Sequence, residues 1–94
     1  MRLRYTQRAK TDLSEIYDFV AQENRHAAAR IMTKIRDTLS SLIANPFMGR
    51  PGRIDGTREL IVTHFPFIVA YRLQNKDIQV LAIIHTARLW PDAL

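Results

Sequence analysis

Hydrophobic residues in the first half of the chain recur every three or four positions, which is the spacing of one face of an α-helix. The first stripe of this kind predicts a helix that begins at an N-cap on Thr6 and reaches about Gln22. A second stripe predicts another helix over about residues 27–44. The join between them is short, so we expect the two helices to form an antiparallel hairpin.

The other regular segments have the composition and spacing of β-strands. Polar and apolar residues alternate over residues 2–5, which predicts a short N-terminal strand. Three later segments are rich in β-branched and aromatic residues and are separated by short turns: residues 58–62, 67–73 and 78–85. Short turns require antiparallel neighbours, so these segments predict a three-stranded meander. The order β-α-α-β-β-β predicts an α+β fold in which the helical hairpin covers one sheet face and leaves the other for function.

A loop over residues 46–56 separates the second helix from the meander. Asn45-Pro46 ends the helix, because proline has no N–H to continue the hydrogen-bond ladder. The loop holds all three glycines of the protein, and Arg50 and Arg53 project from it. Its length is near the upper end for a connection in a compact domain, which favours a functional role over that of a plain connector.

The length and composition of the chain limit the classes of protein to be considered. A chain of 94 residues is long enough for one hydrophobic core, and we expect a single domain over residues 1–94. The sequence contains no cysteine, which excludes disulfides and thiolate metal sites. No apolar run approaches the roughly 20 residues that span a bilayer, and the first residues lack the apolar stretch of a signal peptide. These features predict a cytoplasmic protein with no membrane partner.

The charge of the chain points to an anionic partner. Fourteen Lys and Arg residues against nine Asp and Glu residues give a formal net charge of +5, and all of these cations except Lys10, Lys34 and Lys76 are arginines. Arginine presents a planar fork of donors that suits phosphate or carboxylate, so we expect a nucleic acid or an acidic protein as partner. The alternative is that the excess charge serves only solubility.

Candidate chemistry is confined to a set of cations and one aromatic residue. The three histidines lie on different predicted elements, and no glycine-rich loop leads into a lysine at a helix start, so we expect neither a metal nor another cofactor. The candidate binding residues come from the loop, the strand ends and the C-terminal segment: Arg50, Arg53, Arg58, Arg72, His85, Arg88 and Trp90. Such an arginine cluster binds phosphate whether or not it also cuts it. The sequence leaves open which sheet face each residue uses.

Several of these residues also have a structural interpretation. A histidine at a strand end, such as His85, is more often held by hydrogen bonds than used in catalysis. Glu59 is a candidate ion-pair partner for Arg72 or Arg88 across the sheet. Trp90 is a candidate hydrophobic anchor that closes the C-terminal segment on the core.

The order of the elements, together with a series of motifs, resembles the RelE/ParE superfamily of bacterial type II toxins. The likeness covers nearly the whole chain, and several motifs in register are more specific than any one alone. The motifs are Asn45-Pro46, Met48-Gly49-Arg50-Pro51, Gly56-Thr57-Arg58-Glu59-Leu60, Ile68-Val69-Ala70-Tyr71-Arg72 and His85-Thr86-Ala87-Arg88-Leu89-Trp90-Pro91.

The resemblance implies a small basic toxin that a cognate antitoxin neutralises in a hetero-oligomer, with an extended or helical acidic segment of the antitoxin wrapped around it. In one branch, the RelE-like toxins cleave mRNA in the ribosomal A site with a cluster of Lys, Arg and a C-terminal Tyr or His. In the other, the ParE-like toxins poison DNA gyrase. Because the two branches share a fold, the fold does not choose between them.

Three apolar residues favour the ParE-like branch. Ile61, Val62 and Ile68 stand where the RelE-like pattern has cations, and no tyrosine follows Tyr71. The resemblance therefore implies a gyrase inhibitor that binds gyrase without chemistry of its own, with an mRNA endonuclease and a degenerate toxin that retains only antitoxin binding as alternatives. The endonuclease alternative would assign catalysis to Arg58, Arg72, His85 and Arg88.

Overall fold

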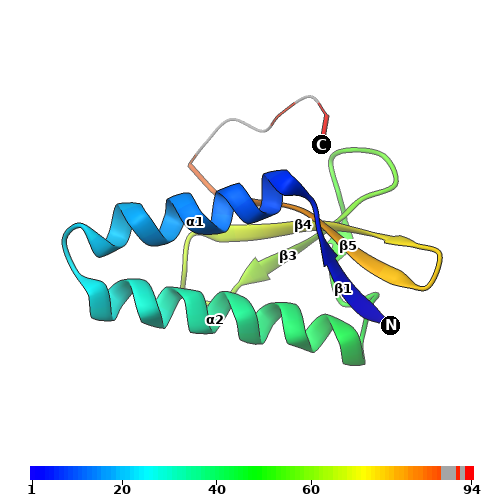
Figure 1. Ribbon diagram of the computed structural model, residues 1–94. Coiled ribbons are helices and arrows are strands. Elements are labelled where there is room, and N and C mark those ends of the chain that lie inside the picture. The colour runs from blue at the N-terminus through cyan, green and yellow to red at the C-terminus, as the bar shows by residue number, and fades with distance from the viewer. Residues whose placement is uncertain (88–90, 92) are drawn as a thin grey trace.

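The chain folds into two helices packed on one face of a five-stranded sheet with the strand order β1-β5-β4-β3-β2 (Figure 1). The computed structural model describes residues 1–87, 91, 93 and 94. Its elements in chain order are β1 (Arg2–Tyr5), α1 (Gln7–Ala21), α2 (Arg25–Ala44), β2 (Arg50–Pro51), β3 (Arg58–Val62), β4 (Phe67–Gln74) and β5 (Asp77–His85). The predicted α+β class and the order of one strand, two helices and a meander are confirmed.

Both helices begin at polar caps. The Thr6 hydroxyl accepts a hydrogen bond from the Ala9 N–H at 3.1 Å, and the Asn24 side chain accepts one from the Ala27 N–H at 3.0 Å. Each cap satisfies a backbone donor that has no partner within the first helical turn. The cap on Asn24 starts α2 at Arg25, slightly earlier than the hydrophobic spacing predicted.

The sheet contains the predicted antiparallel meander of β3, β4 and β5, and β1 joins it in parallel beside β5. The strand β2 is a correction to the sequence analysis, which placed Arg50 and Pro51 in a loop. These two residues pair antiparallel with β3 and form one edge of the sheet. A two-residue strand is too short for a period of two to be visible, and proline is accepted on an edge strand because its missing N–H costs no ladder bond.

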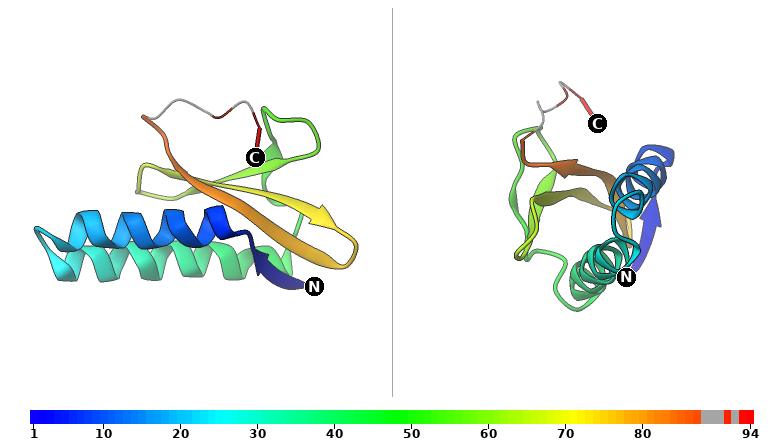
Figure 2. Two further views of the ribbon diagram at one scale, coloured as in Figure 1. Left: turned by 45° about the horizontal axis from the view of Figure 1, so that its top comes forward. Right: turned by 90° about the vertical axis from the view of Figure 1, so that its left-hand side faces the viewer.

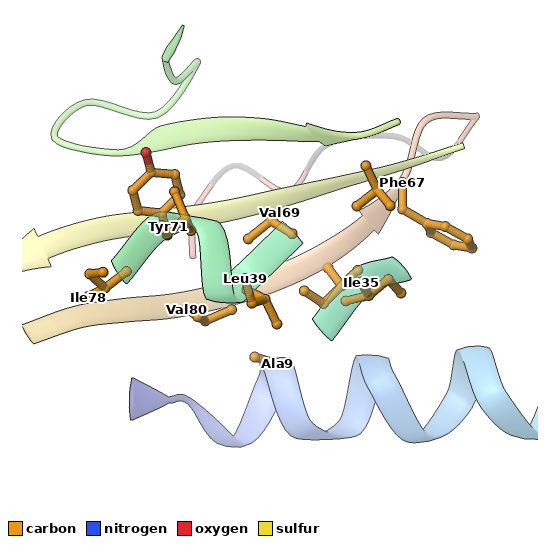
Figure 3. Packing of buried hydrophobic residues seen from close by; sticks show 11 residues of the cluster. Ala9, Ile35, Leu39, Phe67, Val69, Tyr71, Ile78 and Val80 are labelled. Atoms are coloured by element: carbon orange, nitrogen blue, oxygen red, sulfur yellow. The ribbon is translucent and has the colours of Figure 1, made fainter. Parts of the chain in front are cut away.

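The core lies between the helical hairpin and the sheet. Seen along the helices in Figure 2, α1 and α2 lie on the same side of the sheet. Figure 3 shows Ala9 of α1 and Leu39 of α2 facing Val69 and Val80 of the central strands, and all four side chains are buried. Burial of apolar area at about 25 cal/mol per Å² supplies the main favourable free energy of such a core.

One buried hydroxyl fixes the path of the chain after α2. The Tyr71 side chain is fully buried, and its hydroxyl donates to the Pro46 carbonyl at 2.8 Å and accepts from the Gly49 N–H at 2.9 Å. A Cβ on residue 49 would lie 2.6 Å from this hydroxyl oxygen, so only glycine fits. The chain is therefore held against Tyr71 of β4 just before it enters β2.

Burial raises the pKa of Tyr71 above its ordinary value, although the Gly49 N–H and the positive charge of Arg58 act in the opposite direction. Burial also raises the pKa of Tyr5, against a smaller opposing effect of Arg36. The folded state therefore prefers both phenols protonated. Their contribution to stability is complete below the unfolded pKa of about 10 and is lost as the pH rises through the folded pKa values.

We expect the free energy of unfolding to fall on alkalinisation from about pH 8 to about pH 11, by up to about 1.4 kcal/mol per pH unit for each of the two phenols. Urea unfolding curves at both pH values measure this fall. In Tyr71→Phe the fall should be smaller, although its stability near pH 8 should already be about 1–3 kcal/mol lower because Pro46 and Gly49 lose their partner. Equal alkaline losses in wild type and in the Tyr71→Phe, Tyr5→Phe double variant would contradict the expectation.

Candidate functional site

The face of the sheet turned away from the helices, here called the distal face, carries three of the five candidate cations that the structure describes: Arg50, Arg53 and Arg72. Strand register and the separate buried cluster of Ala70 and Ala82 place on it Glu59, Ile61, Ile68, Ala70, Arg72, Gln79, Ala82 and Ile84. Its centre is apolar and closely packed, with Ile68 and Ile84 both buried. The charged groups of this face are gathered toward the end that carries β2 and the loop that follows it.

A buried carboxylate organises that end of the distal face. Glu59 is only 3% exposed, and its Oε1 accepts from Arg50 Nη2 at 3.1 Å, while its Oε2 accepts from the Arg53 backbone N–H at 2.8 Å. The Arg53 Nε lies 3.8 Å from the same Oε2. One carboxylate thus fixes two guanidinium groups whose side chains remain about half exposed. The candidate pairing of Glu59 with Arg72 is wrong, because β2 brings Arg50 opposite Glu59.

Arg72 and Arg58 lie on opposite faces of the sheet. Arg72 is exposed on the distal face, where its Nε donates to the Gln79 side-chain carbonyl at 2.7 Å. Arg58 pairs with Tyr71 on the helix side, and its Nη1 donates to the Gly49 carbonyl at 2.7 Å. Its guanidinium also lies 5.0 Å from the centre of the Phe47 ring. Arg58 therefore holds the chain after α2, and Arg72 is the cation of this pair that an anion on the distal face can reach.

A β-bulge interrupts the pairing of β4 with β5. Ala70 pairs with Ala82 but the next residue, Tyr71, pairs with Val80, so Leu81 is an extra residue on β5. An extra residue exchanges the two faces for every later position of the strand, because side chains alternate with a period of two. From Ala82 to His85, each side chain of β5 therefore lies on the other face of the sheet from the one that simple alternation predicts.

The bulge removes His85 from the distal face. Counting alternately from Gln79 would put His85 on the same face as Arg72, but in the structure His85 pairs with Phe67 on the helix side. Its ring meets the Phe67 ring edge to face at 5.4 Å, and its Nδ1 accepts from the Ala87 N–H at 3.0 Å. His85 also lines an apolar groove of about 370 Å³, here called the His85 groove, with Asp12, Glu15, Ile16, Phe19, Val20, Phe67 and Ile83.

The described members of the endonuclease set do not converge on one place. His85 is opposite Phe67, which is five residues from Arg72 along β4, or about 16 Å at the usual rise of a strand. The two side chains also lie on different faces of the sheet. Two further candidates, Arg88 and Trp90, lie outside the described residues. The described residues thus form a split cationic surface: the group beside Arg50 and Arg53 is the buried carboxylate of Glu59, and His85 lies away from Arg72 on the other face.

The three apolar residues that favoured the ParE-like branch, Ile61, Val62 and Ile68, lie on both faces of the sheet. Val62 points into the core with no exposed surface, and Ile68 is 5% exposed on the distal face opposite Ile61. Ile61 is 53% exposed. This part of the distal face therefore presents aliphatic surface to a partner.

Neither a metal-binding cluster nor a membrane-spanning helix is found in the part of the chain that the structure describes. No group of three or more His, Asp or Glu side chains there is arranged to hold a metal ion. No helix there is long and apolar enough to cross a membrane.

Comparisons of the sequence and of the structure with known proteins both find toxins of type II toxin–antitoxin systems. Residues 3–90 match the model of the ParE toxin of the type II toxin-antitoxin system parDE. The chain is 38% identical to the Sinorhizobium fredii protein named "Putative toxin Y4kP", over 99% of this chain and 96% of that protein. It is 32% identical to Toxin RelE2 of Caulobacter vibrioides, over 90% of this chain and 94% of that protein.

Among solved structures, the chain is similar to one from the chromosomal ParDE TA system of P. aeruginosa, with a TM-score of 0.80 and 33% identity over 90% of this chain and 95% of that one. The YafQ structure from E. coli strain BL21(DE3), at 17% identity and a TM-score of 0.65, shares the fold over 90% of this chain and 92% of that one. The fold and its cationic surface thus define a toxin of a type II toxin–antitoxin system. The chain belongs to the ParE toxin family.

We expect Glu59→Gln to lower the free energy of unfolding by about 1–3 kcal/mol, because the amide keeps the shape but loses the charge-assisted hydrogen bonds to Arg50 and Arg53. Urea unfolding at neutral pH measures the change. Asp55→Asn is the matched control, since it removes the same charge from an exposed position in the loop between β2 and β3. Equal stabilities of the two variants would show that Glu59 does not organise this end of the distal face.

Proposed function

We propose that the protein is a toxin that a cognate antitoxin neutralises by direct binding, and that its cellular target is DNA gyrase. The observation that carries the choice of target is the placement of His85. A nuclease needs an acid or base close to its phosphate-binding cations, but His85 and Arg72 lie on different sheet faces and far apart along β4. Arg50, Arg53 and Arg72 therefore act as a binding surface, and the protein inhibits gyrase without chemistry of its own.

An acidic antitoxin segment fits the charge of the protein. The net charge is +5, and the guanidinium groups of Arg50 and Arg53 are held about half exposed on a single carboxylate. Preorganised arginines lose little side-chain entropy when they bind carboxylates. The P. aeruginosa structure that this chain resembles comes from a ParDE TA system, which supports the proposal of an antitoxin partner. The complex is then a hetero-oligomer, and its location in the cytoplasm stays a prediction.

A second candidate function is mRNA cleavage on the ribosome. The 32% identity to a toxin named RelE2 favours it, and it would use Arg58, Arg72, His85 and Arg88. A third is a degenerate toxin that retains only antitoxin binding. Growth arrest on induction separates the third candidate from the other two.

Expression without the antitoxin should stop growth, accumulate gyrase-linked DNA breaks and leave mRNA uncut in the ribosomal A site. Both products are measured in the same cells. Arg72→Ala should weaken the arrest, because Arg72 is exposed and, among the described residues, its side chain bonds only that of Gln79, whereas His85→Ala should leave the arrest unchanged. A-site cuts that disappear in His85→Ala, with normal DNA topology, would replace the gyrase proposal with the endonuclease.

The rate of association with the antitoxin should fall at least about tenfold between about 50 mM and about 500 mM salt, because the attraction between a basic toxin and an acidic segment is screened. Stopped-flow mixing of the separated proteins measures it. The dissociation rate should change less, since contacts already formed exclude solvent ions. An association rate that does not depend on salt would contradict electrostatic attraction as the basis of recognition.

A further inference from the structure

A band of arginines extends across the five strands of the distal face. On the edge of the sheet opposite β2, β1 lies beside β5 (Figure 1), and its register pairs Arg4 with Gln79 and Arg2 with Asp77. Residues paired in register lie on the same face of a sheet, so both arginines lie on the distal face with Gln79. With the three arginines of β2, its loop and β4 they form what is here called the arginine band: Arg2, Arg4, Arg50, Arg53 and Arg72. The four steps between neighbouring strands make this band about 19 Å wide.

The arginine band is held in place by groups that do not neutralise it. Asp77 accepts from Arg2 Nε at 3.2 Å and from Arg4 Nη1 at 3.4 Å, just as Glu59 holds two arginines at the other edge. Arg72 bonds a neutral amide. Each carboxylate thus orients two arginines and balances the charge of one, so the band keeps a surplus of three positive charges. The four arginines held by carboxylates have side chains that are 53–72% exposed.

The surface around the arginine band suits phosphate better than a peptide. A hollow of about 240 Å³ lies at its β1 side and is lined by polar and charged residues alone: Arg4, Gln74, Asn75, Asp77 and Gln79. A bound peptide gains specificity from pockets for its side chains, and this hollow offers no apolar wall to them. A guanidinium group presents a planar fork of donors that matches the oxygens of a phosphate. The preferred ligand is therefore a row of phosphates.

No aromatic side chain projects from the described strands onto the distal face. Its members other than arginine include Glu59, Ile61, Ile68, Ala70, Gln74, Asp77, Gln79, Ala82 and Ile84. Single-stranded nucleic acids are bound by stacking their bases on aromatic side chains, whereas a duplex is held through its phosphates. At 3.4 Å per nucleotide along one strand of a duplex, the width of the arginine band corresponds to about five or six phosphates.

We propose that the arginine band binds the phosphate backbone of duplex DNA without reading its sequence. The arginines at the two edges, fixed by Glu59 and Asp77, set the direction of the backbone across the strands, and Arg72 contacts it between them. This inference deepens the proposed inhibition of gyrase, on which its cellular role rests, because the toxin then contacts the DNA on which gyrase acts. The binding itself is a property of the toxin alone and can be measured without gyrase.

Fluorescence anisotropy of a labelled duplex of about 20 base pairs tests the ligand. The affinity of the purified protein should fall steeply with salt, with a slope of log affinity against log salt of about −3 or steeper, as expected when at least three phosphates are neutralised. Duplexes of unrelated sequence should bind equally. A single strand of the same length should bind at least about tenfold more weakly. A shallower slope, tighter binding of single-stranded RNA or DNA, or equal affinity for a polyglutamate peptide of the same length would each overturn the inference.

Paired substitutions test the place of binding. The Arg4→Ala, Arg72→Ala double variant should bind the duplex at least about tenfold more weakly at low salt, and its salt slope should be shallower by about two units. The control is Arg25→Ala with Arg30→Ala, which removes the same charge from exposed positions of α2. Equal losses in the two double variants would show that net charge alone attracts DNA and would overturn the inference.

The outcome for gyrase is separate. If the purified toxin does not bind the duplex but gyrase-linked breaks still accumulate on its expression, this inference fails and the gyrase target stands. If the toxin binds the duplex through the arginine band and no such breaks form, the DNA site stands and the gyrase target fails.

Discussion

The buried hydroxyl of Tyr71 is the constraint on which the functional surfaces depend. It joins the Pro46 carbonyl to the Gly49 N–H, and so fixes the chain between the end of α2 and the start of β2. A buried donor and a buried acceptor without partners would each cost about 1–3 kcal/mol, which makes this arrangement the favoured one for residues 46–49. Arg58 supports it from the next strand by bonding the Gly49 carbonyl.

This constraint determines the path of the chain both before and after Gly49. After it, β2 forms and brings Arg50 opposite Glu59, so a buried carboxylate holds two arginines on the distal face. Before it, the chain turns back to α2, and within the described residues Ile61 pairs with β4 on one side and with no strand on the other. A short β2 thus creates both a preorganised cationic surface and an open strand edge. The two surfaces share β3.

The charges of the molecule are distributed unevenly, and this distribution bears on function more than the fold does. Arginines on the distal face and along α2 attract anions, whereas the His85 groove is apolar with two carboxylates in its wall. A fold shared by gyrase inhibitors and mRNA endonucleases does not decide between them. The separation of His85 from Arg72 does bear on the choice, because proton transfer needs groups within hydrogen-bonding distance.

Short-range patterns in the sequence determined the elements. The spacing of apolar residues predicted α1 and α2, Thr6 marked the first N-cap, and β-branched runs between short turns predicted the meander. These predictions succeeded because each depends on interactions within a few residues. The motifs that carry the family resemblance could likewise be read in order along the chain. Phe47 shows the limit of such reasoning, because this large apolar side chain is 65% exposed and packs against Arg58.

Only the tertiary structure decided which residues meet. Sequence spacing could not reveal that Glu59 binds Arg50 and Arg53, because their pairing depends on a two-residue strand with no periodicity of its own. Nor could it reveal that Leu81 is an extra residue, since the bulge arises from the register of two strands and from no property of Leu81 itself. That one residue moves His85 to the other side of the sheet from Arg72. The sequence therefore determined the family and the elements, while long-range register determined the surfaces, because alternation within a strand is local and pairing between strands is not.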